Sequence, residues 1–450
     1  MSDASSLAAD AGESRYRTIL RLALPIMGGM ASQNVMNLVD TAMVGSQGDA
    51  ALAAVGLSSF ANFMAQAFIM GLSVGVQAMA ARRLGEGRHT ETAIPLNGGL
   101  LLAVALGLPV SALLFILAPS FYPFLNDDPK VIAEGVPYLQ ARLCAIAAVG
   151  MNFSFRGYFN GVNLSKIYMR SLLVMHATNL TLNFLLIYGH LGFPQLGATG
   201  AGVGTAIATY VGSLTYIAMG FRYARTGGFL HGLPDKATLT TMLRLSVPSG
   251  ISQLFFAAGL TTLFWIVGRV GTTELAAANV IINVMLVALL PGIGLGIAAA
   301  SLVGQALGRQ DVDDAARWGW EVSRVAVAVL AVLGLPMLLF PAPLLGIFID
   351  DPATIQVGTW PLRAVGASIA IDGIAQVLQA SMLGAGDSRR IMIVNIGLQW
   401  CLFLPIAYLV GPILGQGLLG VWLVQVGYRI LHATLMASFW RRRAWAEIKV

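Results

Sequence analysis

Residues 98–119 read GGLLLAVALGLPVSALLFILAP and contain no charged side chain. A helix of about 20 such residues is long enough to cross the hydrocarbon core of a bilayer. Similar stretches recur from residue 17 to the C-terminus, and of the 450 residues 57% are hydrophobic and only 11% are charged. Soluble domains carry about 25% charged residues. The chain is therefore predicted to be an all-α, multi-pass membrane protein.

Twelve apolar segments are predicted to be transmembrane helices. They cover residues 17–43, 50–81, 93–118, 132–160, 166–189, 196–221, 241–267, 274–305, 316–340, 354–383, 390–411 and 416–440. Most of the 27 Lys and Arg residues fall in alternate connections, whereas Lys130 and Arg269 fall in the opposite ones. Basic loops stay on the cytoplasmic side, so both termini are predicted to be cytoplasmic and the protein to lie in the bacterial inner membrane. The net charge of +6 is thus a topology signal, and no nucleic-acid partner is expected.

The second half of the chain repeats the first at an offset of 223 residues. Arg21-Leu-Ala-Leu-Pro25 corresponds to Arg244-Leu-Ser-Val-Pro248, and Asp127-Asp-Pro129 corresponds to Asp350-Asp-Pro352. Six spans per half is an even number, so the halves are expected to be related by a pseudo-twofold axis along the membrane normal. We expect two six-helix bundles around a central cavity between the halves.

The repeat also sets the expected domain limits. A disordered cytoplasmic tail is assigned to residues 1–14, an N-lobe to 15–226, a connector to 227–240, a C-lobe to 241–440 and a basic tail to 441–450.

Two acidic residues are candidates for an ionisable group at membrane depth. Such a residue costs about 2.5–3.5 kcal/mol at the membrane centre on insertion scales, so it is a functional candidate by default. Their repeat equivalents are aliphatic, so the architecture does not require a carboxylate there, although a buried hydrogen-bonding role is the alternative. The acids are Asp40 and Asp372, and the polar residues expected to line the cavity with them are Gln33, Asn37, Asn62 and Gln66 in the N-lobe and Ser368 and Gln376 in the C-lobe.

Two basic residues, Arg156 and His176, also lie within predicted spans. Arg156 is expected to be structural, with its side chain reaching the cytoplasmic surface, and His176 to be a hydrogen-bonding residue or a proton relay. The polar side chains expected to line the cavity are acidic or neutral, so the cavity wall is expected to carry no positive charge. Gly71-Leu-Ser-Val-Gly75 satisfies the GxSxG pattern, but it lies inside an apolar helix rather than on the strand-to-helix turn that the motif needs. No enzyme activity and no metal site are expected.

Three segments resemble patterns of the multidrug and toxic compound extrusion (MATE) family. They are Leu38-Val-Asp-Thr-Ala-Met-Val-Gly45, Arg156-Gly157 with Gly161, and Leu383-Gly-Ala-Gly-Asp387 after Asp372. The resemblance extends over nearly the whole chain. It implies a monomeric secondary antiporter that exports small, cationic or amphipathic drugs and toxins by rocker-switch alternating access. The exchanged ion would be H⁺ or Na⁺, with no other cofactor.

The resemblance also implies residue roles. In DinF-like relatives an aspartate of span 1 acts with polar residues of spans 5 and 6, and the matching positions are Asp40, Asn179, Asn183 and Thr205. Some relatives carry an acid where Asn183 stands. That second carboxylate is missing in this chain, which favours protons over sodium as the coupling ion. NorM-like relatives pair a span 10 aspartate with a span 7 glutamate, but Phe256 stands at the glutamate position. Asp372 is therefore expected to be a solitary carboxylate, and Pro25 is expected to bend span 1.

One alternative transport function remains open. Flippases of lipid-linked intermediates belong to the same superfamily, and one that moves anionic pyrophosphate lipids should have a basic central cavity. The acidic or neutral stripes expected here favour drug efflux over that function.

Overall fold

The computed structural model describes residues 14–450, so only the last residue of the predicted N-terminal tail lies within it. The described residues are helical with short connections and contain no strand. The helices are α1 (Arg15–Gly45), α2 (Asp49–Met70), α3 (Leu72–Gly85), α4 (Ile94–Phe121), α5 (Pro129–Leu143), α6 (Ile146–Gly161), α7 (Ser165–Tyr188), α8 (Gly197–Tyr223), α9 (Lys236–Gly268), α10 (Thr272–Gly308), α11 (Val312–Leu339), α12 (Pro341–Leu345), α13 (Pro352–Ala385), α14 (Ser388–Ile396), α15 (Leu404–Tyr408) and α16 (Gly417–Arg442).

The helices follow the predicted spans closely. Within the described residues, 10 helices are long and apolar enough to cross a membrane, or 11 if α5 and α6, bent by 47°, form one span. In that count α2 and α3 together form one span, and residues 388–413, which include two π-helical stretches, form another. The remaining predicted span is α1, whose hydropathy is lowered by the polar stripe that includes Asp40. The protein is an all-α, multi-pass membrane protein.

The repeated Asp-Asp-Pro motif starts a helix in each half. Asp128 precedes α5 and accepts a hydrogen bond from the backbone N–H of Lys130 at 2.8 Å. Asp351 precedes α13 and accepts from the N–H of Thr354 at 3.0 Å. The following proline occupies the first helical turn, where its missing N–H costs nothing. Identical local chemistry therefore begins equivalent helices in both halves.

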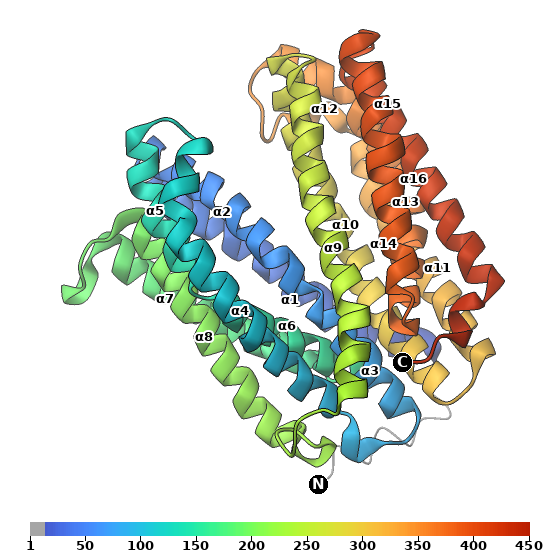
Figure 1. Cartoon of the computed structure of the whole chain (residues 1–450). Coiled ribbons are helices and arrows are strands. Elements are labelled where there is room, and N and C mark those ends of the chain that lie inside the picture. Colours follow the sequence, from blue (N-terminus) through green and yellow to red (C-terminus); the bar gives the residue numbers. More distant parts are fainter. Residues whose placement is uncertain (1–13) are drawn as a thin grey trace.

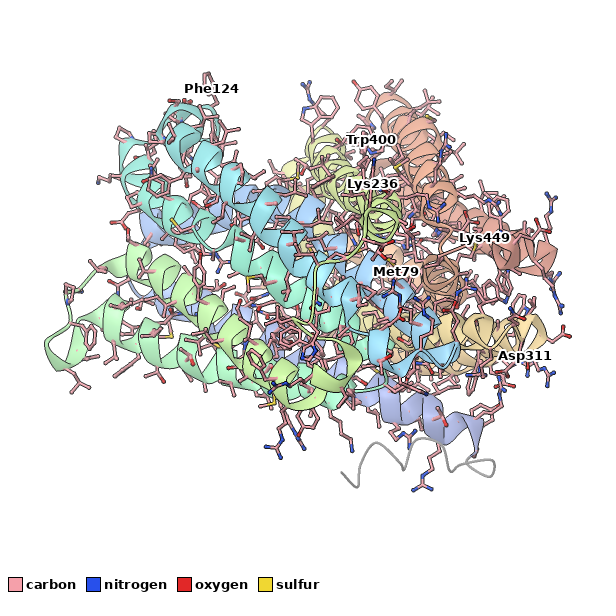
Figure 2. The ribbon with its side chains drawn as sticks, turned by 60° about the horizontal axis from the view of Figure 1, so that its bottom comes forward. Met79, Phe124, Lys236, Asp311, Trp400 and Lys449 are labelled. Atoms are coloured by element: carbon pink, nitrogen blue, oxygen red, sulfur yellow. The ribbon has the colours of Figure 1, made fainter. Side chains whose placement is uncertain are left out.

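Two bundles diverge from one end of the molecule (Figure 1). Helices α1–α8 form one bundle and α9–α16 form the other (Figure 1), and α3 of the first bundle also packs against α9 and α10. Figure 2 turns the narrow end of the molecule forward, and the loop residue Asp311 and the C-terminal Lys449 are labelled there. The chain passes from the first bundle to the second between Tyr223 and Lys236. We call the bundles the N-lobe and the C-lobe; the limits assigned to them from the repeat stay a prediction.

Polar contacts join the lobes near the narrow end. The side-chain amide of Gln305 on α10 donates to the carbonyl of Gly161 and to Oδ1 of Asn163, both at 2.9 Å. Asn163 returns a hydrogen bond to Oε1 of Gln305 at 3.0 Å. Gln77 on α3 donates to the carbonyl of Ile297 at 2.7 Å. The lobes are therefore held together at this end by buried, satisfied hydrogen bonds.

Candidate functional site

A cavity of about 420 Å³ contains most of the polar residues predicted for the N-lobe. Its wall is formed by α1, α2, α5, α6, α7 and α8, and Leu290 of α10 is the C-lobe residue that contributes. The cavity thus lies mainly within the N-lobe rather than symmetrically between the lobes. The predicted residues on its wall are Gln33, Asn37, Asp40, Gln66, Asn179 and Thr205.

Asp40 is held by amide groups from α7. The side-chain nitrogen of Asn183 donates to Oδ1 of Asp40 at 2.8 Å. Asn179 lies beside both carboxylate oxygens, and with its amide oriented so that the oxygen accepts from Thr205, its nitrogen donates to Asp40 at 3.0 and 3.3 Å. None of the described basic residues forms an ion pair with Asp40. The four residues assigned to ion coupling therefore lie together, and their role in coupling stays a prediction.

Two other predicted N-lobe residues, Asn62 and Asn183, do not line the cavity. Asn62 is buried and accepts a hydrogen bond from Gln66 at 3.0 Å, so it positions a wall residue from behind. Asn183 is also fully buried, and it contacts Asp40 although it does not line the cavity.

Pro25 is buried within α1, which continues through it from Arg15 to Gly45. A bend at Pro25 stays a prediction.

Two arginines on the cavity wall contradict the expectation of an acidic or neutral interior. Arg142 on α5 and Arg156 on α6 both line the cavity. Arg156 faces the cavity, with its guanidinium carbon 5.4 Å from the ring centre of Phe153 and 5.6 Å from that of Tyr168. The sequence signal for Arg142 is its position within a predicted span, but its place on the cavity wall depends on the 47° bend between α5 and α6.

The C-lobe has its own cavity, of about 160 Å³. Gln376 and Phe256 lie on its wall, as does Arg429 of α16. Asp372 and Ser368 are 3% and 7% exposed, and they lie behind the wall. The Ser368 hydroxyl donates to the carbonyl of Val365 at 3.3 Å.

The prediction of a solitary Asp372 is wrong. Nη1 of Arg429 lies 3.3 Å from Oδ1 of Asp372, and the two side chains are 14% and 4% exposed. The sequence signal was an arginine inside span 12, but the pairing depends on how α13 and α16 pack. No cluster of three His, Cys, Asp or Glu side chains suited to a metal ion occurs among the described residues.

A family model described as MatE matches residues 25–185 and 248–409, one segment in each half of the chain. The chain belongs to the MatE family. Three relatives cover most of it. A probable multidrug resistance protein NorM of Synechococcus sp. is 30% identical over 435 residues, which cover 93% of this chain and 92% of that protein. Another of Thermotoga maritima is 26% identical, with 96% and 93% covered. A multidrug resistance protein NorM of Photobacterium profundum is 26% identical, with 88% and 87% covered.

Solved structures of the MATE fold superpose on the chain. An outward-facing conformation of a multidrug resistance MATE family transporter gives a TM-score of 0.88 at 22% identity, with 96% of each chain covered. A MATE crystal structure in the bent conformation gives 0.87 at 23% identity, with 95% of each chain covered. At this identity the likeness shows the fold alone. In this member of the MatE family, the amide-held Asp40 lies in the N-lobe and the paired Asp372 lies in the C-lobe.

Proposed function

We propose that the protein is a secondary antiporter that exports small cationic or amphipathic organic compounds in exchange for H⁺ or Na⁺. The observation that carries the proposal is Asp40, a carboxylate on the wall of a polar cavity, held by Asn183 at 2.8 Å and without an ion pair to the described residues. A half-buried carboxylate within a membrane-spanning helix is costly without a counter-ion. A proton, a metal cation or a cationic substrate would each neutralise it.

Ion coupling would follow because a proton, a metal cation and a cationic substrate compete for the same carboxylate. One carboxylate cannot hold a proton and balance a second cation at the same time. A proton arriving from outside would favour release of the substrate, and loss of that proton to the cytoplasm would reset the site. The relatives' names support efflux of drugs.

Alternating access would require the lobes to separate at their narrow end. There Gln305 bonds to Gly161 and Asn163 across the lobe boundary. Rocking of the two bundles as rigid bodies would break these bonds and open the cavity toward the narrow end. Other polar contacts cross the same junction, among them the hydrogen bond from Gln77 to Ile297 and the ion pair between Arg15 and Asp314, and they would have to break as well.

Transport in proteoliposomes tests the proposal. Proteoliposomes that contain the purified protein would be loaded with ethidium, and a proton gradient and a sodium gradient would be imposed across their membrane separately. Export driven by one gradient in the wild type, and lost in Asp40→Asn, is the expected result. Ethidium export at the same rate with and without either gradient would refute antiport.

A lipid flippase is the second candidate, because Arg142 and Arg156 give the cavity wall more positive than negative side chains. An anionic head group would be attracted to them. Translocation of a fluorescent polyprenyl pyrophosphate analogue in the same liposomes separates the two functions. Translocation of the lipid without gradient-driven ethidium export would favour the flippase.

A further inference from the structure

A further hollow lies outside both lobe cavities, where the start of α11 meets the end of α16. Its volume is about 550 Å³, and none of the residues that line it lines either lobe cavity. The two helices meet through Trp440, whose indole N–H donates to the carbonyl of Ala316 at 3.3 Å. Gly319 lies against the same ring, where a Cβ atom would have no room. We call this hollow the α11–α16 cleft; Figure 2 labels Asp311, just before α11, at this end of the molecule.

Four arginines and two acidic residues line the α11–α16 cleft. Asp313 forms an ion pair with Arg443 at 2.6 Å, and Glu321 forms one with Arg15 of α1. No described carboxylate forms an ion pair with the other three lining arginines, which are Arg317, Arg324 and Arg441. The side chains of all three are exposed. The cleft therefore presents three positive charges that a negatively charged ligand could balance.

Two of these arginines share one face of α11 with apolar residues further along the helix. Arg317 and Arg324 are seven residues apart, which is about two helical turns. Leu335 follows eleven residues later, after about three more turns, and is 49% exposed. Val332 and Leu339 lie beside it and are 65% and 58% exposed. Because α11 is long and apolar enough to cross a membrane, lipid chains would lie along this apolar part of the face.

The predicted span places the arginines near the membrane–water interface. Arg324 is twelve residues into α11, about 18 Å along the helix, and falls inside the apolar stretch predicted to begin at residue 316. A charged arginine within a span is costly unless a counter-charge or water reaches it. The guanidinium carbon of Arg441 lies 5.6 Å from the ring centre of Trp320, and tryptophan is enriched where spans meet water. Lipid head groups occupy the same layer, so they are the anions nearest to the cleft.

We propose that the α11–α16 cleft binds the phosphate head group of an anionic phospholipid, whose acyl chains lie along the apolar part of the α11 face. A guanidinium offers donors in a planar fork that matches phosphate oxygens. Basic pockets between membrane-spanning helices suit such head groups. A soluble phosphate carries the same charge, but it makes no use of the exposed Val332, Leu335 and Leu339. The site is separate from the lobe cavities, so the proposal does not depend on the efflux function.

Dioleoylphosphatidylglycerol and dioleoylphosphatidylcholine provide matched probes, because they share their acyl chains and only the first carries a net negative charge. Each would be titrated into the full-length protein in detergent, and the affinity for the first bound lipid measured by native mass spectrometry. The wild type should prefer phosphatidylglycerol. One basic residue near an anionic head group contributes enough for about a fivefold change in affinity. Arg324→Gln should therefore lower the ratio of the two affinities about fivefold, and adding Arg317→Gln and Arg441→Gln should lower it further.

Arg170→Gln is the matched control. Arg170 is an exposed arginine near the start of α7, without an ion pair to the described residues and outside the cleft. Its loss should leave the affinity ratio unchanged. An excess of glycerol 3-phosphate, which has the phosphate but no acyl chains, should leave phosphatidylglycerol bound.

Three results would overturn the proposal. Equal affinities of the wild type for the two lipids would show that the cleft does not select a charged head group. An equal loss in Arg170→Gln and Arg324→Gln would assign the preference to basic residues in general. Displacement of phosphatidylglycerol by glycerol 3-phosphate would make the cleft a site for soluble phosphates. All of the variants change exposed side chains, so the folded protein is available for each comparison.

Discussion

Nη1 of Arg429 lies 3.3 Å from Oδ1 of Asp372, so the C-lobe acid has a resident counter-charge from a neighbouring helix. The N-lobe acid, Asp40, has amide donors instead. A guanidinium already balances the first carboxylate, whereas the second is balanced by no described cation in direct contact. The two acids should therefore respond differently to neutralisation.

Asp40→Asn should abolish ion-coupled export while leaving the protein folded. The amide keeps the size of the side chain but cannot take up a proton or balance a cation. The measurement is ion flux per exported ethidium in liposomes, with thermal stability and expression as controls. Full coupling by a well-folded variant would exclude Asp40 as the coupling site.

Asp372→Asn should retain coupling but lose stability. It leaves the guanidinium of Arg429 buried without its counter-charge, and breaking a buried pair costs about 3–5 kcal/mol. The double variant Asp372→Asn with Arg429→Gln removes both charges and should recover much of that loss. Thermal unfolding in detergent compares the three proteins. If Asp372→Asn uncouples transport and Asp40→Asn does not, the C-lobe carries the driving site.

Gln305→Ala should weaken closure of the narrow end. The change removes the hydrogen bonds to Gly161 and Asn163, each of which contributes about 1 kcal/mol. In a background with Cys144→Ser and Cys401→Ser, a cysteine at Gln33 on the cavity wall should then react faster with a membrane-impermeant thiol reagent applied from the side of the termini. Unchanged labelling would mean that other contacts hold the junction.

Asp351→Ala should lower the melting temperature at neutral pH but not in strong acid. Hydrogen bonds from the hydroxyl and N–H of Thr354 hold the pKa of the Asp351 carboxyl below its usual value. The charged cap stabilises the folded protein above the unfolded-state pKa of about 3.9, and this contribution is lost as the pH falls through the lower folded-state pKa. The difference between wild type and variant should shrink as the pH is lowered below about 4. A constant difference would show that the charge of the cap is irrelevant.

Cysteine labelling checks the orientation in the membrane. Single cysteines at Gln47, Asn126, Leu191 or Gly271 should react with an impermeant reagent added to intact cells. Those at Gly87 or Gly228 should react only after the cells are opened. The opposite pattern would reverse the assigned orientation and place both termini outside.

The spans, their duplication and the chemistry that starts the two matching helices can be predicted from local sequence. Hydropathy and the Asp-Asp-Pro motif are local properties, so Asp128 and Asp351 could be placed without knowing any distant contact. The resemblance to the family also brought Asp40 and Asn183 into one set, which the structure joins at 2.8 Å.

Which side chains of different helices meet depends on how the helices pack. Helical periodicity tells which residues share a face, but not which face of another helix lies opposite. Asp372 and Arg429 belong to helices separated by another span, so their ion pair depends on how α13 and α16 pack. Arg156 could equally have extended to the membrane surface; the packing of α6 against α7 places it between Phe153 and Tyr168, facing the cavity, because a long flexible side chain takes the direction that its neighbours leave open.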